Sequence, residues 1–288
     1  MRLKRREFVF GLAAGAAGTS RLAAQQPSPQ TREPVFRVSR ANSVPGPEQS
    51  PLDLALDMAR QALAHSRSSI DDYTAVIIKR EQVSGKLSEP EYMFAKIRNR
   101  KVMEGRLAVP FSVYLLFLKP ADVKGREVVY VENKNDGKLI AHEGGMKGRF
   151  LPTVPLLPTG VLAMRGQRYP LTEIGIENLI AKLIERGETA RRHPEITCEF
   201  RHNAKLKDRK CTIIQLNQPR KVSELDFSVA QVFIDDELNI PIRYVAYDWP
   251  AQPGGPGQIL EEYTYLDVKV NVGLSDTDFD RNNPKYGF

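Results

Sequence analysis

The sequence predicts an α+β protein in which an antiparallel sheet of about ten strands is combined with two amphipathic helices. Short runs rich in β-branched and aromatic residues recur along the chain, which is typical of strands. Turn-forming residues such as Ser84-Gly85 and the Asn-Asp-Gly of 135–137 separate these runs. Two further stretches carry apolar residues at helical spacing. Short strands joined by tight turns favour an antiparallel meander.

The predicted strands form two sets, separated by an irregular segment and the second helix. The first set consists of residues 73–83, 91–98, 111–118, 125–132 and 138–142. The second set consists of residues 196–201, 211–217, 230–234, 240–247 and 260–270. The polar residues 235–239 are typical of a turn, so the strands on either side of them should form a hairpin.

Both predicted helices carry recognisable boundary residues. The first has Ser50 as N-cap and Pro51 at its first position, and it should end before the polar run 66–69. The second has Thr172 as N-cap and Gly187 as its stop. Their apolar faces consist of Leu52, Leu56, Ala59 and Leu63 in the first helix, and of Ile176, Leu179, Ile180, Leu183 and Ile184 in the second.

Residues 143–166 interrupt the strand pattern with recurring glycine and proline, yet they carry many apolar side chains. An apolar loop of this length is uncommon, because loops run over the surface. Two interpretations remain open from the sequence: the segment packs over a single core, or it forms a mobile lid over a ligand cavity. The lid candidates are Phe150, Leu151, Leu156 and Leu157.

Residues 1–24 are predicted to form an export signal. A basic start is followed by a short apolar run that is about half of the roughly 20 residues needed to span a bilayer. The pair Arg5-Arg6 resembles a twin-arginine motif, whereas Lys4 replaces the usual Ser or Thr, so export by the Sec route remains open. Cleavage is expected after Ala24. Residues 25–49, rich in Pro, Ser, Gln and Arg, should form a disordered linker, and residues 50–288 a single domain.

The charge of the chain follows largely from this signal. The formal net charge is +7, but residues 1–24 carry five basic residues and one acidic residue, which leaves +3 for the remainder. A charge this small does not favour nucleic-acid binding. After residue 24 no apolar run is long enough to span a membrane, so the cleaved protein is not expected to be membrane-spanning.

Cys198 and Cys211, the two cysteines, lie in neighbouring predicted strands. If residues 203–206 form the turn, the cysteines face one another across an antiparallel pair, and a disulfide would follow in an oxidising compartment. If the turn lies nearer Lys207-Asp208, the cysteines are separated. Both registers are compatible with the sequence.

No pattern typical of a catalytic or metal site is found in the sequence. The four histidines lack a neighbouring His or Cys at metal-ligand spacing. No Gly-x-Ser-x-Gly elbow is present, and the glycines of 144–148 lack phosphate-loop spacing. We therefore expect no enzymatic activity, no metal and no cofactor.

Short motifs from about residue 50 to the C-terminus carry a family resemblance. They are Asp72-Tyr73-Thr74-Ala75, Lys79-Arg80-Glu81, Lys96-Ile97-Arg98, the runs 110–114 and 125–130, Arg168-Tyr169-Pro170, the run 239–243, Glu261-Glu262-Tyr263-Thr264-Tyr265 and Asp278-Phe279-Asp280. Together they resemble an uncharacterised exported bacterial family, the domain of unknown function 1571, which is related in pattern to LolA-like outer-membrane lipoprotein carriers. The resemblance implies a strongly curved, unclosed antiparallel sheet, or half-barrel, with helices packed on its concave face.

In the carriers, a cavity between sheet and helices shelters acyl chains, so the resemblance implies an exported, periplasmic binding protein for a lipid or another apolar ligand. Lipoprotein acyl chains or an envelope protein are the implied partners. The competing hypothesis is an envelope interaction or sensor module with a filled core. The candidate cavity residues are Tyr92, Phe94, Phe111, Tyr114, Phe117, Ile176, Leu179, Ile180 and Leu183.

Overall fold

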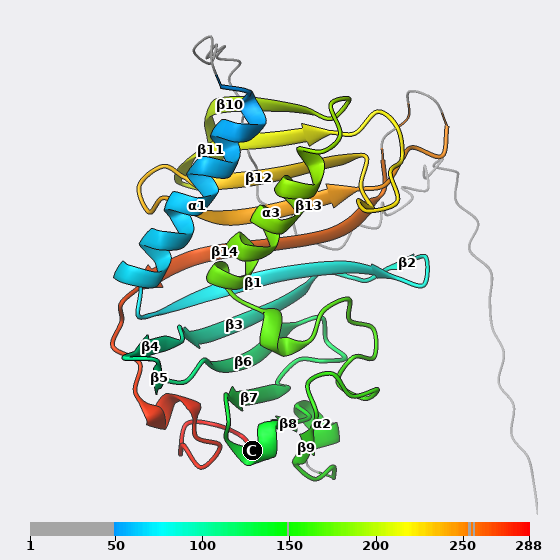
Figure 1. Cartoon of the computed structure of the whole chain (residues 1–288). Helices are drawn as coiled ribbons and strands as arrows, with labels where there is room; N and C mark the ends of the chain where they lie inside the picture. Colours follow the sequence, from blue (N-terminus) through cyan, green and yellow to red (C-terminus); the bar gives the residue numbers. More distant parts are fainter. Residues whose placement is uncertain (1–48, 149, 253–254, 256) are drawn as a thin grey trace, which may run out of the picture. The chain divides into compact units, whose positions relative to one another are not determined.

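The computed structural model describes residues 49–288 except 149, 253–254 and 256, and its centre is one antiparallel sheet of 12 strands (Figure 1). Eleven strands follow the order β10-β11-β12-β13-β14-β1-β3-β6-β7-β8-β9, and β2 pairs with β1. The strands of this sheet in the first half of the described chain are β1 (Asp72–Val83), β2 (Lys86–Leu87), β3 (Glu91–Arg98), β6 (Ser112–Lys119), β7 (Glu127–Val131), β8 (Leu139–His142) and β9 (Val154–Leu156). The strands in the second half are β10 (Thr197–Leu206), β11 (Arg209–Asn217), β12 (Val229–Asp235), β13 (Ile240–Tyr247) and β14 (Ile259–Val270).

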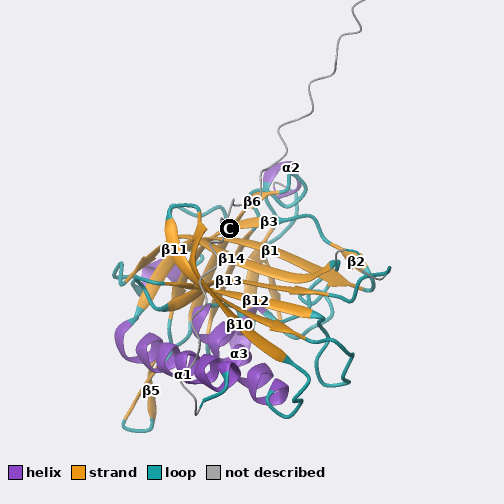
Figure 2. Ribbon diagram, turned by 90° about the horizontal axis from the view of Figure 1, so that it is seen from above, coloured by secondary structure: helices purple, strands orange, loops and turns teal. Residues whose placement is uncertain are grey.

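The sheet is open and curved, with β10 and β9 as its two edges, and two long helices lie across its concave face (Figures 1 and 2). These helices are α1 (Pro51–Ser69) and α3 (Ile176–Ala190). Shorter elements are α2 (Gly145–Gly148), the 3-10 turns η1 (Asn135–Gly137), η2 (Leu171–Glu173) and η3 (Asp276–Phe279), and a separate hairpin of β4 (Lys101–Met103) and β5 (Arg106–Val109). The predicted α+β class and the open antiparallel sheet are confirmed.

The central strand β1 pairs with β14 on one side and with β3 on the other, so strands from both ends of the domain lie side by side. Tyr73 pairs with Val270 and with Ile97 near one end, and Glu81 pairs with Glu261 near the other. Residues that pair across antiparallel strands point to the same face of a sheet. This register therefore decides which side chains meet on the concave face.

The start of α3 is fixed to the sheet by a buried hydrogen bond. The backbone N–H of Ile176 donates to the hydroxyl of Tyr73 at 2.8 Å, and both residues are buried. Gly175 precedes the helix with φ of 112°, a conformation that residues with a side chain rarely adopt. The predicted N-cap at Thr172 is wrong, because Thr172 lies in the separate turn η2.

The predicted stop at Gly187 is also wrong, since α3 continues to Ala190. Gly187 serves instead as the point of close approach between the two helices. A Cβ atom at this position would lie 2.7 Å from Leu56 Cδ2 of α1. The glycine thus permits the helices to pack closely. In a sequence, a glycine at such a contact looks the same as a glycine that ends a helix.

The convex face of the sheet is covered in part by the C-terminal segment, residues 271–288. This segment packs on β6, β7 and β8, and the Tyr286 ring stacks on that of Tyr114 with centroids 3.9 Å apart. The apolar cluster between them consists of Tyr114, Val129, Val131, Ile140 and Phe279, with Phe94, Leu116, Leu274, Tyr286 and Phe288 packed against it.

The predicted signal peptide (1–24) lies outside the described residues, and so does the predicted linker (25–49) except for Gln49. Within the described chain, none of the helices combines the length and the apolar character needed to cross a bilayer.

The disulfide that one of the two registers would allow is not formed. The β10–β11 hairpin turns at Lys207-Asp208, so Cys198 pairs with Leu216 and Cys211 pairs with Ala204, and both thiols are free. This is the second of the two registers that the sequence allowed. Burial raises the pKa of each thiol to about 12, with a further contribution from Glu199 at Cys198.

We predict that thiol titration of the protein unfolded without reductant will find both cysteines reactive. In the folded protein at neutral pH both should react slowly, because buried thiols with a raised pKa hold little thiolate. A protein that shows free thiols only after reduction would contradict this register.

We predict that Tyr73→Phe will lower the free energy of unfolding by about 1–3 kcal/mol, because the buried N–H of Ile176 loses its acceptor. Tyr130→Phe provides the control, since the hydroxyl of this buried tyrosine makes no hydrogen bond to another described residue, and the change should alter stability by less than about 0.5 kcal/mol. Urea denaturation of both variants measures the difference. Equal losses would show that the hydrogen bond does not hold α3.

Candidate functional site

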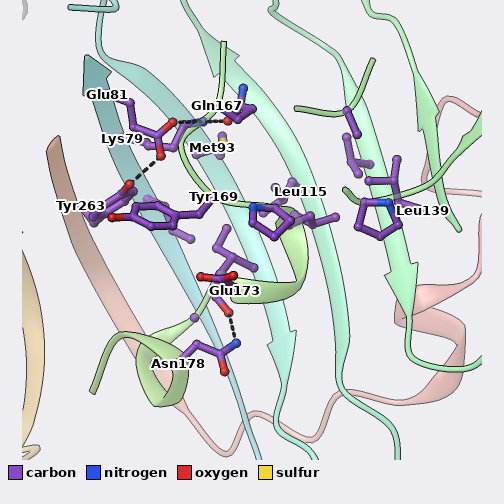
Figure 3. A pocket seen from close by; sticks show the side chains of 18 of the residues that line it. Lys79, Glu81, Met93, Leu115, Leu139, Gln167, Tyr169, Glu173, Asn178 and Tyr263 are labelled. Carbon is purple, nitrogen blue, oxygen red and sulfur yellow. Dashed lines mark hydrogen bonds and ion pairs between the residues drawn. The ribbon is translucent and has the colours of Figure 1, made fainter. Parts of the chain in front are cut away.

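A cavity of about 640 Å³ lies between the concave face of the sheet, α3 and the segment from residue 152 to residue 175 (Figure 3). The side chains of the sheet that line it are mostly apolar. They include Ile77, Met93, Leu115, Phe117, Val128, Leu139 and Ala141. The opposite side is formed by Pro158, Leu162, Ala163, Ile174, Leu179 and Leu183.

The register of the strands explains why these residues meet. Leu115 of β6 pairs with Val128 of β7, Val128 pairs with Ala141 of β8, and Ala141 pairs with Val154 of β9. All four line the cavity, as residues paired across antiparallel strands must share a face. The edge strand β9 therefore extends the floor of the cavity.

A second cavity of about 430 Å³ lies on the other side of α3, between α1 and the concave face of β11, β12 and β13. Leu183, Arg186 and Tyr244 line both cavities. The helix α3 thus separates two apolar spaces that share one wall.

The predicted cavity residues occupy different places. Phe117, Leu179 and Leu183 line the larger cavity, and Ile180 and Leu183 line the smaller one. Ile176 is buried in the core, and Phe111 packs against that core; neither lines either cavity.

Tyr92, Phe94 and Tyr114 require a correction, because their side chains point to the convex face. Alternation correctly places Tyr92 and Phe94 on one face of β3, but Met93 between them faces the cavity. Phe94 and Tyr114 instead pack with the C-terminal segment. Alternation alone gives the two faces of a strand without showing which of them meets the helices.

Of the four lid candidates, one lines the larger cavity and three do not. Leu156, in β9, lines the larger cavity. Phe150, Leu151 and Leu157 are exposed and do not line it. Pro152, Val154 and Pro158, which the sequence prediction omitted, line the cavity in their place.

One end of the larger cavity is polar, because two carboxylates lie side by side in its wall. Glu81 of β1 and Glu261 of β14 are paired residues on the same face, and they are only 3% and 1% exposed. Like charges directly opposite one another destabilise a sheet, and buried charges need partners. Figure 3 shows Glu81 with Lys79, Gln167, Tyr169 and Tyr263 at this end and the apolar Leu115 and Leu139 away from it.

Two arginines from the covering elements neutralise these carboxylates. Arg186 of α3 lies 3.1 Å from a carboxylate oxygen of Glu261 and donates to the hydroxyls of Tyr169 (2.8 Å) and Tyr244 (2.9 Å). Arg168 lies 3.3 Å from Glu261, and its backbone N–H donates to Glu81 at 2.9 Å. The ion pairs hold both α3 and the preceding segment against the sheet.

Four further contacts complete this polar cluster. Asp226 pairs with Arg168 and lies 3.3 Å from Arg186. Lys79 contacts Gln167 and lies 3.0 Å from Glu91. With Glu81 and Glu261, the cluster holds three cations and four carboxylates, so its charges almost balance.

The tyrosines of the cluster stay protonated at neutral pH. Burial, and then the neighbouring Glu261, raises the pKa of Tyr169 to about 12. Burial together with Glu261 and Glu81 raises the pKa of Tyr263 further, and its hydroxyl donates to Glu81 at 2.5 Å. The cluster therefore offers neutral hydroxyls and engaged charges, an environment suited to holding elements together and to contacting a polar group of a ligand.

Sequence reasoning missed this cluster, although the signal was present. Lys79 and Glu81 follow Ile77 at alternate positions of one strand, which places charges in an apolar row. Most of the cluster lies in three of the motifs that carried the family resemblance: Lys79-Arg80-Glu81, Arg168-Tyr169-Pro170 and Glu261-Glu262-Tyr263. Among the described residues, no group of His, Cys, Asp and Glu is arranged to hold a metal ion.

The sequence matches the model of one protein family, described as Protein of unknown function (DUF1571), over residues 70–288. The chain belongs to this family. The match covers β1 to the C-terminus and includes every residue of the polar cluster. No match was found among curated proteins.

Solved structures with a similar chain path come from several bacteria. A DUF1329 family protein from Desulfovibrio piger is 13% identical, with 81% of this chain and 98% of that chain covered and a TM-score of 0.38. A LolA superfamily protein from Nitrosomonas europaea is 9% identical, with 78% and 97% covered and a TM-score of 0.31. A chain in the complex structure of Pseudomonas aeruginosa MucA/MucB is 13% identical, with 78% and 60% covered and a TM-score of 0.39. A LolA superfamily protein is thus among the similar structures, at a level of similarity that does not indicate a shared ligand.

We predict that Arg168 and Glu261 are energetically coupled. Arg168→Gln should lower the free energy of unfolding by about 3 kcal/mol, because buried carboxylates lose a partner. Adding Glu261→Gln should recover part of this loss, with a coupling of about 1–3 kcal/mol in a double-mutant cycle measured by urea denaturation.

The matched control is the surface pair of Arg60 and Glu188, which should couple by less than about 1 kcal/mol. A coupling for Arg168 and Glu261 as small as that of the control would show that the arginine does not compensate the buried carboxylates.

Proposed function

We propose that this protein is an exported, non-enzymatic binding protein that holds a lipid or another apolar ligand between its curved sheet and α3. The observation that carries the proposal is the apolar cavity of about 640 Å³, which lies within the roughly 300–1,000 Å³ of small-molecule sites. Acyl chains, including those of lipoproteins, have the shape and chemistry of this space.

The binding energy in this proposal comes from burial of the ligand. Each methylene removed from water contributes about 0.8 kcal/mol, so eight of them contribute about 6 kcal/mol before the costs of ordering. The polar cluster at one end would contact the polar group of an amphipathic ligand, for example through Lys79 and Tyr169. No covalent chemistry enters this proposal.

The competing function is an envelope interaction or sensor module whose core is filled and which takes no small ligand. The two functions differ in what they require of Ala141, on the floor of the larger cavity. A filled core leaves no room beyond its methyl group, whereas an open cavity accepts a larger side chain.

We predict that Ala141→Phe will weaken binding of an apolar fluorescent probe by about tenfold or more, because the added ring occupies the ligand space. The same change should leave the melting temperature equal or higher. In a filled core, overpacking would instead cost about 1–3 kcal/mol. Probe titration and thermal unfolding are the two measurements.

Ala108→Phe is the matched control, since Ala108 is exposed on the separate β4–β5 hairpin and should affect neither measurement. A wild-type protein that binds no apolar probe, together with a destabilised Ala141→Phe variant, would favour the filled core and reject the carrier function.

A further inference from the structure

The exposed apolar side chains of this protein are concentrated in one segment. Among the described residues, ten large hydrophobic side chains are exposed, and seven of them lie between residues 146 and 162. They are Met146, Phe150, Leu151, Val154, Leu157, Val161 and Leu162. Scattered exposed apolar residues are normal, but a concentration of this kind marks an interaction surface.

This segment, residues 146–162, is called the apolar strap below. It also forms part of the larger cavity, which Pro152, Val154, Leu156, Pro158 and Leu162 line. The remaining apolar side chains point elsewhere, with Phe150 85% and Val161 89% exposed. One set of strap residues thus closes the cavity, while a second set meets solvent at the same end of the sheet, near β8 and β9 (Figure 1).

The sequence of the strap and its flanks has no acidic residue to balance its basic ones: residues 144–172 contain Lys147, Arg149, Arg165 and Arg168. Arg168 is engaged with Glu261 and Asp226 in the polar cluster. Arg165 is exposed at the rim of the cavity, and no ion pair joins it to another described residue. Glu143, just before this stretch, is paired with Arg126 at 3.0 Å. A surface that is apolar and basic complements one that is apolar and anionic.

We propose that the apolar strap docks on the surface of an anionic lipid bilayer. Exposed aromatic and aliphatic side chains beside basic residues are the combination by which proteins enter the interface of a membrane. The position at the cavity adds a second reason, since an apolar ligand could pass between bilayer and cavity without crossing water.

A protein partner is less well matched to the same surface. The sheet edge within the strap is β9, which is three residues long and contains Pro155. Short edge strands with proline resist pairing with another strand. The strap therefore offers side chains and positive charge, with little backbone for a partner to pair with.

The test is flotation of the purified full chain with vesicles of phosphatidylcholine alone and of phosphatidylcholine mixed with phosphatidylglycerol. The wild-type protein should float with the anionic vesicles, and added salt should weaken this binding. The triple variant Phe150→Ser, Leu157→Ser, Val161→Ser should bind about tenfold less or weaker, and Arg165→Ala about fivefold less.

The matched control is Val102→Ser, Met103→Ser on the β4–β5 hairpin, whose side chains are 57% and 67% exposed and which lies apart from the strap in both views (Figures 1 and 2). This variant should bind vesicles as the wild type does. Probe binding by the cavity is measured in all variants and should persist in the triple variant, since none of its three residues lines the cavity. Docking and ligand binding can therefore fail separately.

A triple variant that floats as well as the wild type would overturn the proposal, as would a wild type that binds neither kind of vesicle. If that wild type instead forms a concentration-dependent dimer that the triple variant loses, the strap belongs to an interface with a second copy of the chain.

Discussion

Two buried carboxylates, Glu81 and Glu261, lie directly opposite one another near one end of the two central strands, β1 and β14, and their charge must be compensated. A like-charged pair at such a position costs free energy unless cations reach it. Arg186 reaches it from α3 and Arg168 from the preceding segment. The same ion pairs that neutralise the carboxylates therefore hold α3 and the preceding segment over the cavity.

The wall of the larger cavity has an apolar part, which can bind a ligand, and a polar part, which holds the covering elements against the sheet. The apolar part, formed by strands β3, β6, β7 and β8, can hold a ligand by burial alone. The polar cluster maintains the geometry, because its cations and carboxylates are already engaged with one another. Three of the motifs that carried the family resemblance, Lys79-Arg80-Glu81, Arg168-Tyr169-Pro170 and the run 261–265, meet in this cluster although they lie far apart in the sequence. Outside the wall, the apolar strap places hydrophobic side chains and positive charge at the same end of the sheet.

Sequence patterns predicted the class of fold and most strands, since alternation, turn residues and helical spacing are local signals. They did not predict features that depend on contacts between distant parts of the chain, such as the orientation of a side chain or the role of a glycine. The face that Tyr114 takes is decided by the C-terminal segment, through its contact with Tyr286. The role of Gly187 is decided by the approach of Leu56 from the other helix. The pairing of Cys198 was left open, because the sequence allowed two positions for the turn between β10 and β11. The polar cluster was missed because a single strand does not show that its charged residues are buried beside those of another.

The central claim is that the larger cavity is occupied in the native protein. Its most direct test is mass spectrometry of an organic extract from the protein, expressed with its export signal and purified without detergent. We expect a co-purifying lipid or other apolar molecule in near-stoichiometric amount, and we expect it to be depleted from the Ala141→Phe variant purified in parallel. An extract without any apolar molecule, or one whose content is the same in both proteins, would contradict it.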